Sequence, residues 1–368
     1  MRIALLGDIA LYGKYSISNS EVYSYFRDVA TKLKEFDYVV GNLETPLCTS
    51  CKAQGYKSAF IKAAEENVKL LKYLNVGITN LANNHIFDYG INGYQSTKKV
   101  LEENGIKYFG IENKQLKIEK DDTKVVFSGY CCYSTNGLGY FDPKTQIGVN
   151  ILDCLKVEKT LIESYKEGYL NIISFHIGQE HVNYPNYDHV EMARFFSQCA
   201  PYVFYGHHPH VIQGIEEVNN SILAYSLGNF CFDDVYTNKS KEPLVKQSEE
   251  NKKSLILSLE IRDNKVIKYD AIPLYADKGK LQVGTHTSIL QDLKYYSKFL
   301  SVDKKQYIIE RTKIINKYIN ARKKKRDLVW YIKRLNLNSV GMIVNAKYNK
   351  KKYRKYITEY LKINSKLM

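Results

Sequence analysis

Short apolar runs and amphipathic segments alternate along the first three quarters of the chain. Apolar residues with helical spacing occur at 21–34, 64–73, 93–104, 157–167 and 190–199. Apolar runs of strand length occur at 2–6, 37–40, 77–81, 108–109, 124–130, 170–175, 202–205, 222–226, 254–261 and 266–273. This alternation predicts an α/β domain, in which functional residues sit on the loops that follow strands.

The pattern changes towards the end of the chain. Residues 233–251 are polar and show no periodic apolar pattern. They therefore predict a surface loop, which we expect to lie near the functional site of the domain. Further on, 308–335 has the spacing of one long helix, with a basic run at 322–326 in its middle. We therefore predict a domain over 1–275 and a basic, mainly helical region over 276–368.

The charge follows the same division. Residues 276–368 hold 24 Lys and Arg against 6 Asp and Glu, a balance of +18, whereas the first 275 residues hold 30 and 33. The basic region could be a solvated helix packed on the domain through its apolar stripe. Alternatively, Trp330 and Tyr331 among the lysines predict peripheral contact of 304–356 with an anionic membrane. A third reading is nucleic-acid binding, but no recognisable nucleic-acid fold accompanies the basic runs.

The composition limits the cellular compartments in which we expect the protein. No apolar stretch approaches 18 residues, and Asp8 leaves no room for a signal peptide before it. We therefore expect a cytoplasmic protein. The alternative is a protein that contacts the inner face of the membrane peripherally. Seven cysteines are few for a chain of this length, and an odd number cannot all pair, which argues against a disulfide framework. We therefore expect Cys48 and Cys51 to be reduced thiols.

Six of the eight histidines fall in three short segments, each just after an apolar run: 83–85, 176–181 and 206–210. Two further runs end in carboxylates, Asp8 and Glu44. Imidazole, carboxylate and carboxamide are ligands of Mn, Zn and Fe. The sequence thus predicts a centre with one or two divalent ions at the rim of a sheet. Such a centre generates hydroxide at neutral pH and neutralises charge on a phosphoryl or carbonyl oxygen.

Six ordered motifs over residues 1–275 resemble the CapA family of poly-γ-glutamate capsule biosynthesis proteins, within the calcineurin-like metallophosphoesterase superfamily. They are Gly7-Asp8, Gly41-Asn-Leu-Glu-Thr-Pro-Leu47, Leu81-Ala-Asn-Asn-His-Ile-Phe-Asp-Tyr-Gly90, His176-Ile-Gly-Gln-Glu180, Gly206-His-His-Pro-His-Val211 and Ser226-Leu-Gly-Asn-Phe230. The resemblance implies a four-layer αββα sandwich with metal ions at the strand ends.

The resemblance also implies a set of metal ligands. The first aspartate ligand matches Asp8, and Glu44 stands where the superfamily has a bridging aspartate. Asn84 matches the ligand of the Asn-His pair, and His176 matches the isolated ligand histidine. The final His-x-His fits His208 and His210.

The same comparison implies residues for proton transfer. His85 matches the general acid, and Asp88 could orient it through a hydrogen bond while capping the turn. His207 is a further catalytic candidate, and by a shift of register it could replace one of its neighbours as a ligand. The first motif departs from the superfamily's Asp-x-His because Ala10 takes the third position, which removes a ligand from one metal.

A last group comprises candidates for substrate contact. Asn83 could instead only shape its turn, and Asn229 could belong to the metal's outer shell or to a tight turn beside Gly228. Two members lie on the expected loop after the fourth strand end. The group is Asn42, Asn83, Glu180, His181 and Asn229.

We therefore predict a metal-dependent hydrolase, in first place a phosphoesterase, that acts in synthesis of a capsule or another surface polymer. Its substrate would be an anionic polymer or a phosphorylated small molecule. The alternative is a non-catalytic accessory protein that keeps the fold and organises a polymer synthase, which Ala10 and the basic tail favour. Amide hydrolysis at the same centre is a third possibility, since metal-activated hydroxide also attacks carbonyl carbons.

Overall fold

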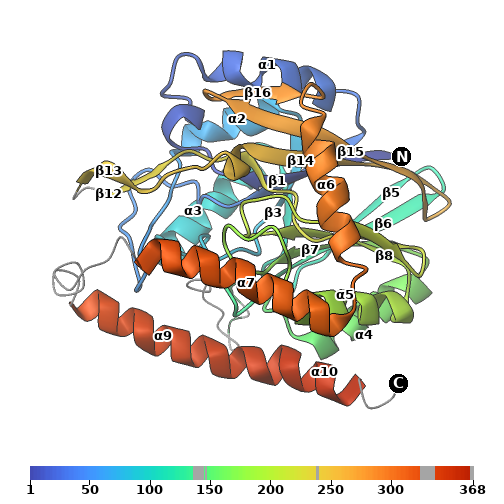
Figure 1. Cartoon of the computed structure of the whole chain (residues 1–368). Coiled ribbons are helices and arrows are strands. Elements are labelled where there is room, and N and C mark those ends of the chain that lie inside the picture. Colours follow the sequence, from blue (N-terminus) through green and yellow to red (C-terminus); the bar gives the residue numbers. More distant parts are fainter. Residues whose placement is uncertain (136–144, 146, 238–239, 324–335, 365–368) are drawn as a thin grey trace.

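The computed structural model describes residues 1–135, 145, 147–237, 240–323 and 336–364. Two mixed β-sheets lie face to face, and helices cover their outer surfaces (Figure 1). Within the described residues, no helix combines the length and the apolarity needed to cross a bilayer.

The first sheet has the strand order β16-β15-β14-β1-β2-β3-β4, and β11 pairs with the end of β1. Strands β1 to β4 are parallel, and β14 joins them in the antiparallel sense. Their bounds are β1 Arg2–Ile9, β2 Tyr38–Leu43, β3 Val76–Asn80, β4 Lys107–Phe109, β11 Asn229–Cys231, β14 Lys253–Arg262, β15 Lys265–Asp277 and β16 Lys280–Val283.

The second sheet has the order β5-β6-β7-β8-β10-β9, in which β6, β7, β8 and β10 are parallel. Since the carboxyl ends of parallel strands meet at one edge, both sheets can offer side chains there. The bounds are β5 Leu116–Lys120, β6 Thr123–Cys131, β7 Leu170–His176, β8 Tyr202–His207, β9 Ile215–Val218 and β10 Ser221–Ala224.

Three apolar cores separate the layers. The middle core lies between the sheets, where Ile3 and Leu5 of β1 meet Phe127 and Ile172. Alternate residues of β1 belong to the outer core under the first sheet, as expected for a strand buried on both faces. The four-layer αββα sandwich is confirmed. The helices are α1 Val22–Leu33, α2 Val68–Tyr73 and α3 Gly90–Glu103 on the first sheet, with α4 Cys154–Lys166 and α5 Tyr187–Cys199 on the second.

The C-terminal part is helical, as predicted, and residues 308–323 of the predicted helix 308–335 lie within a single helix. It comprises α6 (Ser288–Phe299), α7 (Lys304–Lys323) and α9 (Leu337–Tyr353), which continues through a π-helical turn into α10 (Glu359–Asn364). Residues 324–335 of the predicted helix, including Trp330 and Tyr331, lie outside the described residues. Helix α9 has its own start, because Asn336 is extended (φ −157°) and caps it through the Ser339 N–H.

Four observations complete the comparison with the sequence. The ten predicted strands and the five predicted helices of the domain are present within a few residues. The segment 233–251, predicted as a loop, contains the hairpin β12 (Val235–Thr237) and β13 (Ser240–Val245); its strands pair only with each other, so no apolar face marked them. Cys48 and Cys51 form a disulfide instead of two thiols. The predicted boundary at 275/276 falls inside β15.

Candidate metal centre

Strand register brings the predicted site residues side by side. In the first sheet, Asp8 of β1 lies opposite Asn42 of β2 and Asn229 of β11. In the second sheet, His176 ends β7 opposite His207 of β8. The two rows meet at the edge where the strands of both sheets end. Close approach of β1 to the turn before β11 requires Gly7, since a Cβ there would lie 2.0 Å from the carbonyl oxygen of Gly228.

Asp8 is fully buried and held on every side. Asn42 Nδ2 donates to its Oδ1 at 2.8 Å, and the His208 backbone N–H donates to Oδ2 at 3.3 Å. His207 Nδ1 lies 2.9 Å from Oδ1, and His210 Nδ1 lies 3.3 Å from Oδ2. Burial raises the pKa of Asp8, but the contacts with His207 and His210 outweigh it and the pKa lies well below its usual range. Asp8 is therefore a carboxylate.

Glu44 is also fully buried, but neither of its oxygens has a hydrogen-bond partner among the described residues. Three imidazole nitrogens surround its Oε1: Nε2 of His210 at 3.7 Å, of His85 at 3.8 Å and of His176 at 3.9 Å. Burial, followed by the charge of Asp8, raises the pKa of Glu44 well above its usual value. A buried carboxylate without donors is costly unless a cation compensates it.

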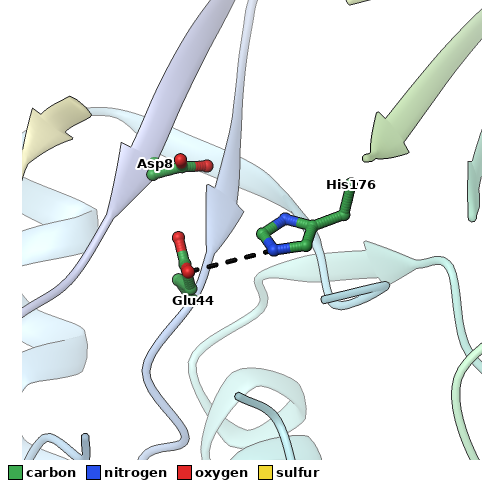
Figure 2. Close-up of side chains that lie close together, drawn as sticks. All are labelled: Asp8, Glu44 and His176. Atoms are coloured by element: carbon green, nitrogen blue, oxygen red, sulfur yellow. Dashed lines mark ion pairs between the residues drawn. The ribbon is translucent and has the colours of Figure 1, made fainter. Parts of the chain in front are cut away.

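The donors fit a divalent cation. Ligand atoms of Asp8, Glu44 and His176 all lie within 4.8 Å of one another, and Figure 2 shows the three side chains converging from separate strand ends. Asn84 Oδ1 adds a carboxamide oxygen 2.8 Å from His176 Nε2. Two carboxylates, one imidazole and one amide oxygen suit Mn, Zn or Fe. Ala10 is buried and supplies no ligand atom, and its N–H donates to Cys231 O.

The 207–210 segment brings three histidines to the centre in a strained backbone. His208 and His210 have φ values of 92° and 56°, a region that non-glycine residues rarely adopt. Burial lowers the pKa of His208 to about 4. Burial also acts on His210, but the carboxylates of Glu44 and Asp8 outweigh it and raise the pKa of His210 to about 10. Nε2 of His207 and Nδ1 of His208 are buried without a hydrogen-bond partner among the described residues, whereas Nδ1 of His207 faces Asp8.

His85 belongs to a second cluster at the edge of the centre. Its Nδ1 lies 2.6 Å from Asp88 Oδ2, so Nε2 is the atom that faces Glu44. Lys57 bonds the other oxygen of Asp88 and lies 3.3 Å from His85 Nδ1. Burial lowers the pKa of His85, and Lys57 adds to that effect while Asp88 opposes it. Asp88 keeps a pKa below its usual value because His85 and Lys57 outweigh its burial.

Two of the predicted substrate-binding residues make their described contacts inside the protein. Asn42 donates to Asp8, and its Oδ1 accepts from Asn80 Nδ2 at 3.0 Å and from Asn83 Nδ2 at 3.4 Å. Asn83 Oδ1 accepts the backbone N–H groups of His85 and Ile86, both at 3.0 Å. These amides fix the carboxylate and the histidine turn, so substrate contact by them remains a prediction.

Three other candidates lie towards the rim. Asn229 Oδ1 accepts a hydrogen bond from His210 Nδ1 at 2.9 Å, which orients the ring. His181 Nδ1 lies 3.0 Å from Asn251 Nδ2, and the same amide donates to His210 O at 2.8 Å. Glu180 lines a cavity together with His208. The structure thus brings all fourteen predicted site residues to one edge of the sandwich.

Sequence reasoning missed the residues that reach the site from outside the strand ends. Lys57 lies in the long connection between β2 and α2, and Asn251 follows the β12–β13 hairpin. Neither stands beside a histidine or at the end of an apolar run, so no local pattern marks it. Asn80, which ends β3, could have been found by the same strand-end reasoning that found Asp8.

Comparison with solved structures finds weak likenesses across most of the chain. A phosphatase from Mycoplasma pneumoniae is 16% identical and covers 75% of this chain and 93% of its own, with a TM-score of 0.46. A putative 5′-nucleotidase from Staphylococcus aureus, solved with alpha-ketoglutarate, is 11% identical and covers 81% and 57%, with a TM-score of 0.44.

Similarity to curated sequences is closer. The PGA biosynthesis protein CapA of Bacillus subtilis (strain 168) is 31% identical over 253 residues, which is 66% of each chain. The capsule biosynthesis protein CapA of Bacillus anthracis is 29% identical over 296 residues, covering 76% of this chain and 68% of that protein. The chain thus spans about two thirds of the length of these relatives. The family model for the bacterial capsule synthesis protein PGA_cap matches residues 2–234, with every predicted site residue inside it, so the chain belongs to this family.

Proposed function

We propose that this chain is a metal-dependent hydrolase that cleaves a phosphoester bond during synthesis of a capsule or another surface polymer. The observation that carries the proposal is Glu44, a buried carboxylate without hydrogen-bond donors that faces three imidazole nitrogens beside Asp8. Selection for stability alone would not keep such a group, whereas a cation site requires it.

The ion would be held by Asp8, Glu44 and His176, with Asn84, His208 and His210 as further ligands. When bound, it would supply Lewis-acid activation of water and of the phosphoryl oxygen. One ion is favoured over two, because Ala10 offers no donor where a second ion would need one. Mn, Zn or Fe would suit this mixed set of oxygen and nitrogen ligands.

His85 would move a proton at Nε2. Asp88 holds its Nδ1 and so fixes both the ring orientation and the nitrogen that faces the reacting group. Lys57 neutralises Asp88 and keeps a positive charge at the edge of the centre, where an anionic substrate would arrive. His207, which contacts Asp8, would support the ligand carboxylate or take part in proton transfer.

The test combines metal content and turnover. Protein purified without chelator would be analysed by elemental mass spectrometry, and hydrolysis of bis(4-nitrophenyl) phosphate and 4-nitrophenyl phosphate would be followed with Mn²⁺ or Zn²⁺. We expect one equivalent of metal and turnover that is lost in His208→Ala. Absence of stoichiometric metal even after reconstitution would overturn the proposal.

A second role at an anionic membrane surface is favoured by the outward face of α9 (Figure 1). Four apolar side chains are exposed there: Leu337 by 85%, Val340 by 54%, Ile343 by 58% and Val344 by 60%. Exposed Lys347 and Lys351 continue the same face at helical spacing, so apolar and basic groups are presented together. In this role the protein would act at the inner face of the membrane, as an enzyme or as an accessory to a polymer synthase.

Sedimentation with phosphatidylglycerol vesicles tests the membrane role. We expect binding that weakens with salt and is absent with phosphatidylcholine vesicles. Replacing Val340, Ile343 and Val344 by Ser should abolish it, whereas Ile267→Ser, an exposed apolar residue on β15, should not. Equal binding of both variants would contradict a role for α9.

A further inference from the structure

A cavity of about 290 Å³ adjoins the candidate metal centre. His208, a candidate ligand, lines the cavity, and α7 contributes Tyr318 to the lining. This volume is at the lower end of ligand pockets, about 300 Å³, which suits a single ring more than an extended polymer. The side chains that line it include Ser134, Gln179, Glu180, Asn186, His208 and Tyr318.

Helix α7 supplies the outer wall and is anchored firmly beside it. Tyr307, Arg311 and Tyr318 recur at spacings of four and seven, so they share the face that meets the domain. The buried hydroxyl of Tyr307 donates to Pro185 O at 2.9 Å, and Arg311 Nε donates to Tyr184 O at 3.0 Å. The ring of Tyr318 lies 6.2 Å from that of His181.

Arg311 also sets the polar lining of the cavity. Its Nη2 donates to Gln179 Oε1 at 3.4 Å and to Asn186 Oδ1. Both amide oxygens are thus held by the guanidinium. Asn186 Nδ2 also lies 3.4 Å from His189 Nε2, so Asn186 is engaged within the protein and Gln179 is the amide side chain that can donate to a ligand. Arg311 is a positioning residue, because it does not itself line the cavity.

The lining has the chemistry that recognises a sugar ring. Amide and carboxylate side chains pair with hydroxyl groups in both senses, and an aromatic ring covers an apolar C–H face. We propose that this cavity binds a sugar ring attached to the phosphoryl group whose ester is cleaved. This inference rests on the proposed hydrolase function and names its substrate class: a sugar phosphate or a phosphodiester of a sugar.

A poly-γ-glutamate segment fits the cavity less well. Each of its residues carries a carboxylate, and Glu180 adds a like charge to the lining, in which the described residues include no Lys or Arg. Tyr318 and Arg311 lie outside the family match of residues 2–234.

Saturation-transfer NMR separates the ring site from the metal site. The first probe is N-acetylglucosamine with chelator-treated full-length protein. Because the chelator removes any bound metal, binding of the sugar then reports on the ring site alone. We expect transfer to the ring protons, an affinity about tenfold weaker in Tyr318→Ala, and little change in Tyr318→Phe, which keeps the aromatic face. Ile319→Ala, next to it on the exposed side of α7, is the matched control and should behave as wild type.

Three results would overturn the inference: no transfer to the sugar, equal transfer in wild type and Tyr318→Ala, or stronger binding of γ-glutamylglutamate than of the sugar. The second probe is inorganic phosphate with Mn²⁺-loaded protein, which reports only on the metal site. If the Mn²⁺-loaded protein binds no phosphate but still binds the sugar, the proposed hydrolase function would be overturned, whereas the proposed ring site would be supported.

Discussion

The metal centre and the C-terminal helices satisfy their polar groups in opposite ways. At the centre, Glu44 is buried without donors and His208 has a strained backbone. In the C-terminal helices, tyrosine hydroxyls find partners: the buried Tyr307 bonds Pro185, and the partly buried Tyr353 bonds Asp188 and His189. The candidate centre therefore contains groups that cost stability when no ligand is present, whereas the hydroxyls of the helices are satisfied within the protein.

Glu44→Gln should have the largest effect, because it removes a charge that the centre needs only when a cation is bound. Metal content and phosphodiester hydrolysis should both be lost. Thermal unfolding sharpens the comparison: Mn²⁺ at about 100 times its Kd should stabilise wild type by about 2.7 kcal/mol and leave the variant unchanged. In chelator the variant should be at least as stable as wild type, since the raised pKa of Glu44 already favours its uncharged form when no cation is bound. A less stable variant in chelator would contradict this account of Glu44.

His85→Asn should lower kcat by about 10²–10⁴-fold, the usual contribution of a positioned proton donor or acceptor. Metal content should stay at the wild-type value, since Asp8, Glu44 and His176 are untouched. Elemental analysis and steady-state kinetics on the same preparation measure both. Loss of metal together with activity would show that His85 is a ligand.

Asp88→Asn should have a smaller effect, about 10–100-fold in kcat, because it removes an orienting partner and leaves the imidazole itself. The side-chain oxygen of the new Asn can still accept the hydrogen bond that the Ile61 N–H donates to Asp88, so folding should be retained. A changed pH–rate profile is expected along with the lower rate, since Asp88 favours the protonated form of His85. An unchanged profile would indicate a purely structural role.

His189 tests the anchoring of the C-terminal helices, and its replacement should have the smallest effect on hydrolysis. It is buried on α5 with Nε2 3.0 Å from the Tyr353 hydroxyl, and burial lowers its pKa to about 4. The unfolded chain, with a pKa of about 6.5, takes up this proton first, so stability falls as the pH drops from about 6.5 towards 4. The loss should approach about 3 kcal/mol over that window.

His189→Gln should remove this part of the acid sensitivity. Urea unfolding of both proteins at several pH values between 7 and 5 measures the difference in slope. Parallel pH dependences would show that His189 does not stay neutral in the folded protein.

The sequence predicted best where one physical rule applies over a short range. Asp8, Glu44 and His176 could be placed because each ends an apolar run, and the carboxyl ends of parallel strands converge. The alternation predicted an α/β domain, and the αββα layers were implied by the family resemblance alone. The β12–β13 hairpin escaped because its polar strands pair only with each other and carry no periodic apolar face.

The sequence could not reveal the outer wall of the cavity, and the reason is different. Tyr318 stands in a helix whose tyrosines, isoleucines and lysines follow one another closely, and only docking against the 179–187 loop decides which of them faces the site. Lys57 is similar, since its role depends on where the connection between β2 and α2 folds back.

Lys57 also joins the two regions compared above. Its ammonium group bonds Asp88 beside His85, and its backbone carbonyl accepts from Asn338 of α9 at 3.1 Å. If α9 docks at a membrane and the candidate centre binds phosphate, both events would act on Lys57, so we expect the two to be thermodynamically coupled. Linkage is reciprocal: if vesicles change the affinity for phosphate by some factor, phosphate must change the affinity for vesicles by the same factor. Measuring vesicle binding with and without phosphate in wild type and Asn338→Ala would reveal that coupling, and identical affinities in all four cases would exclude it.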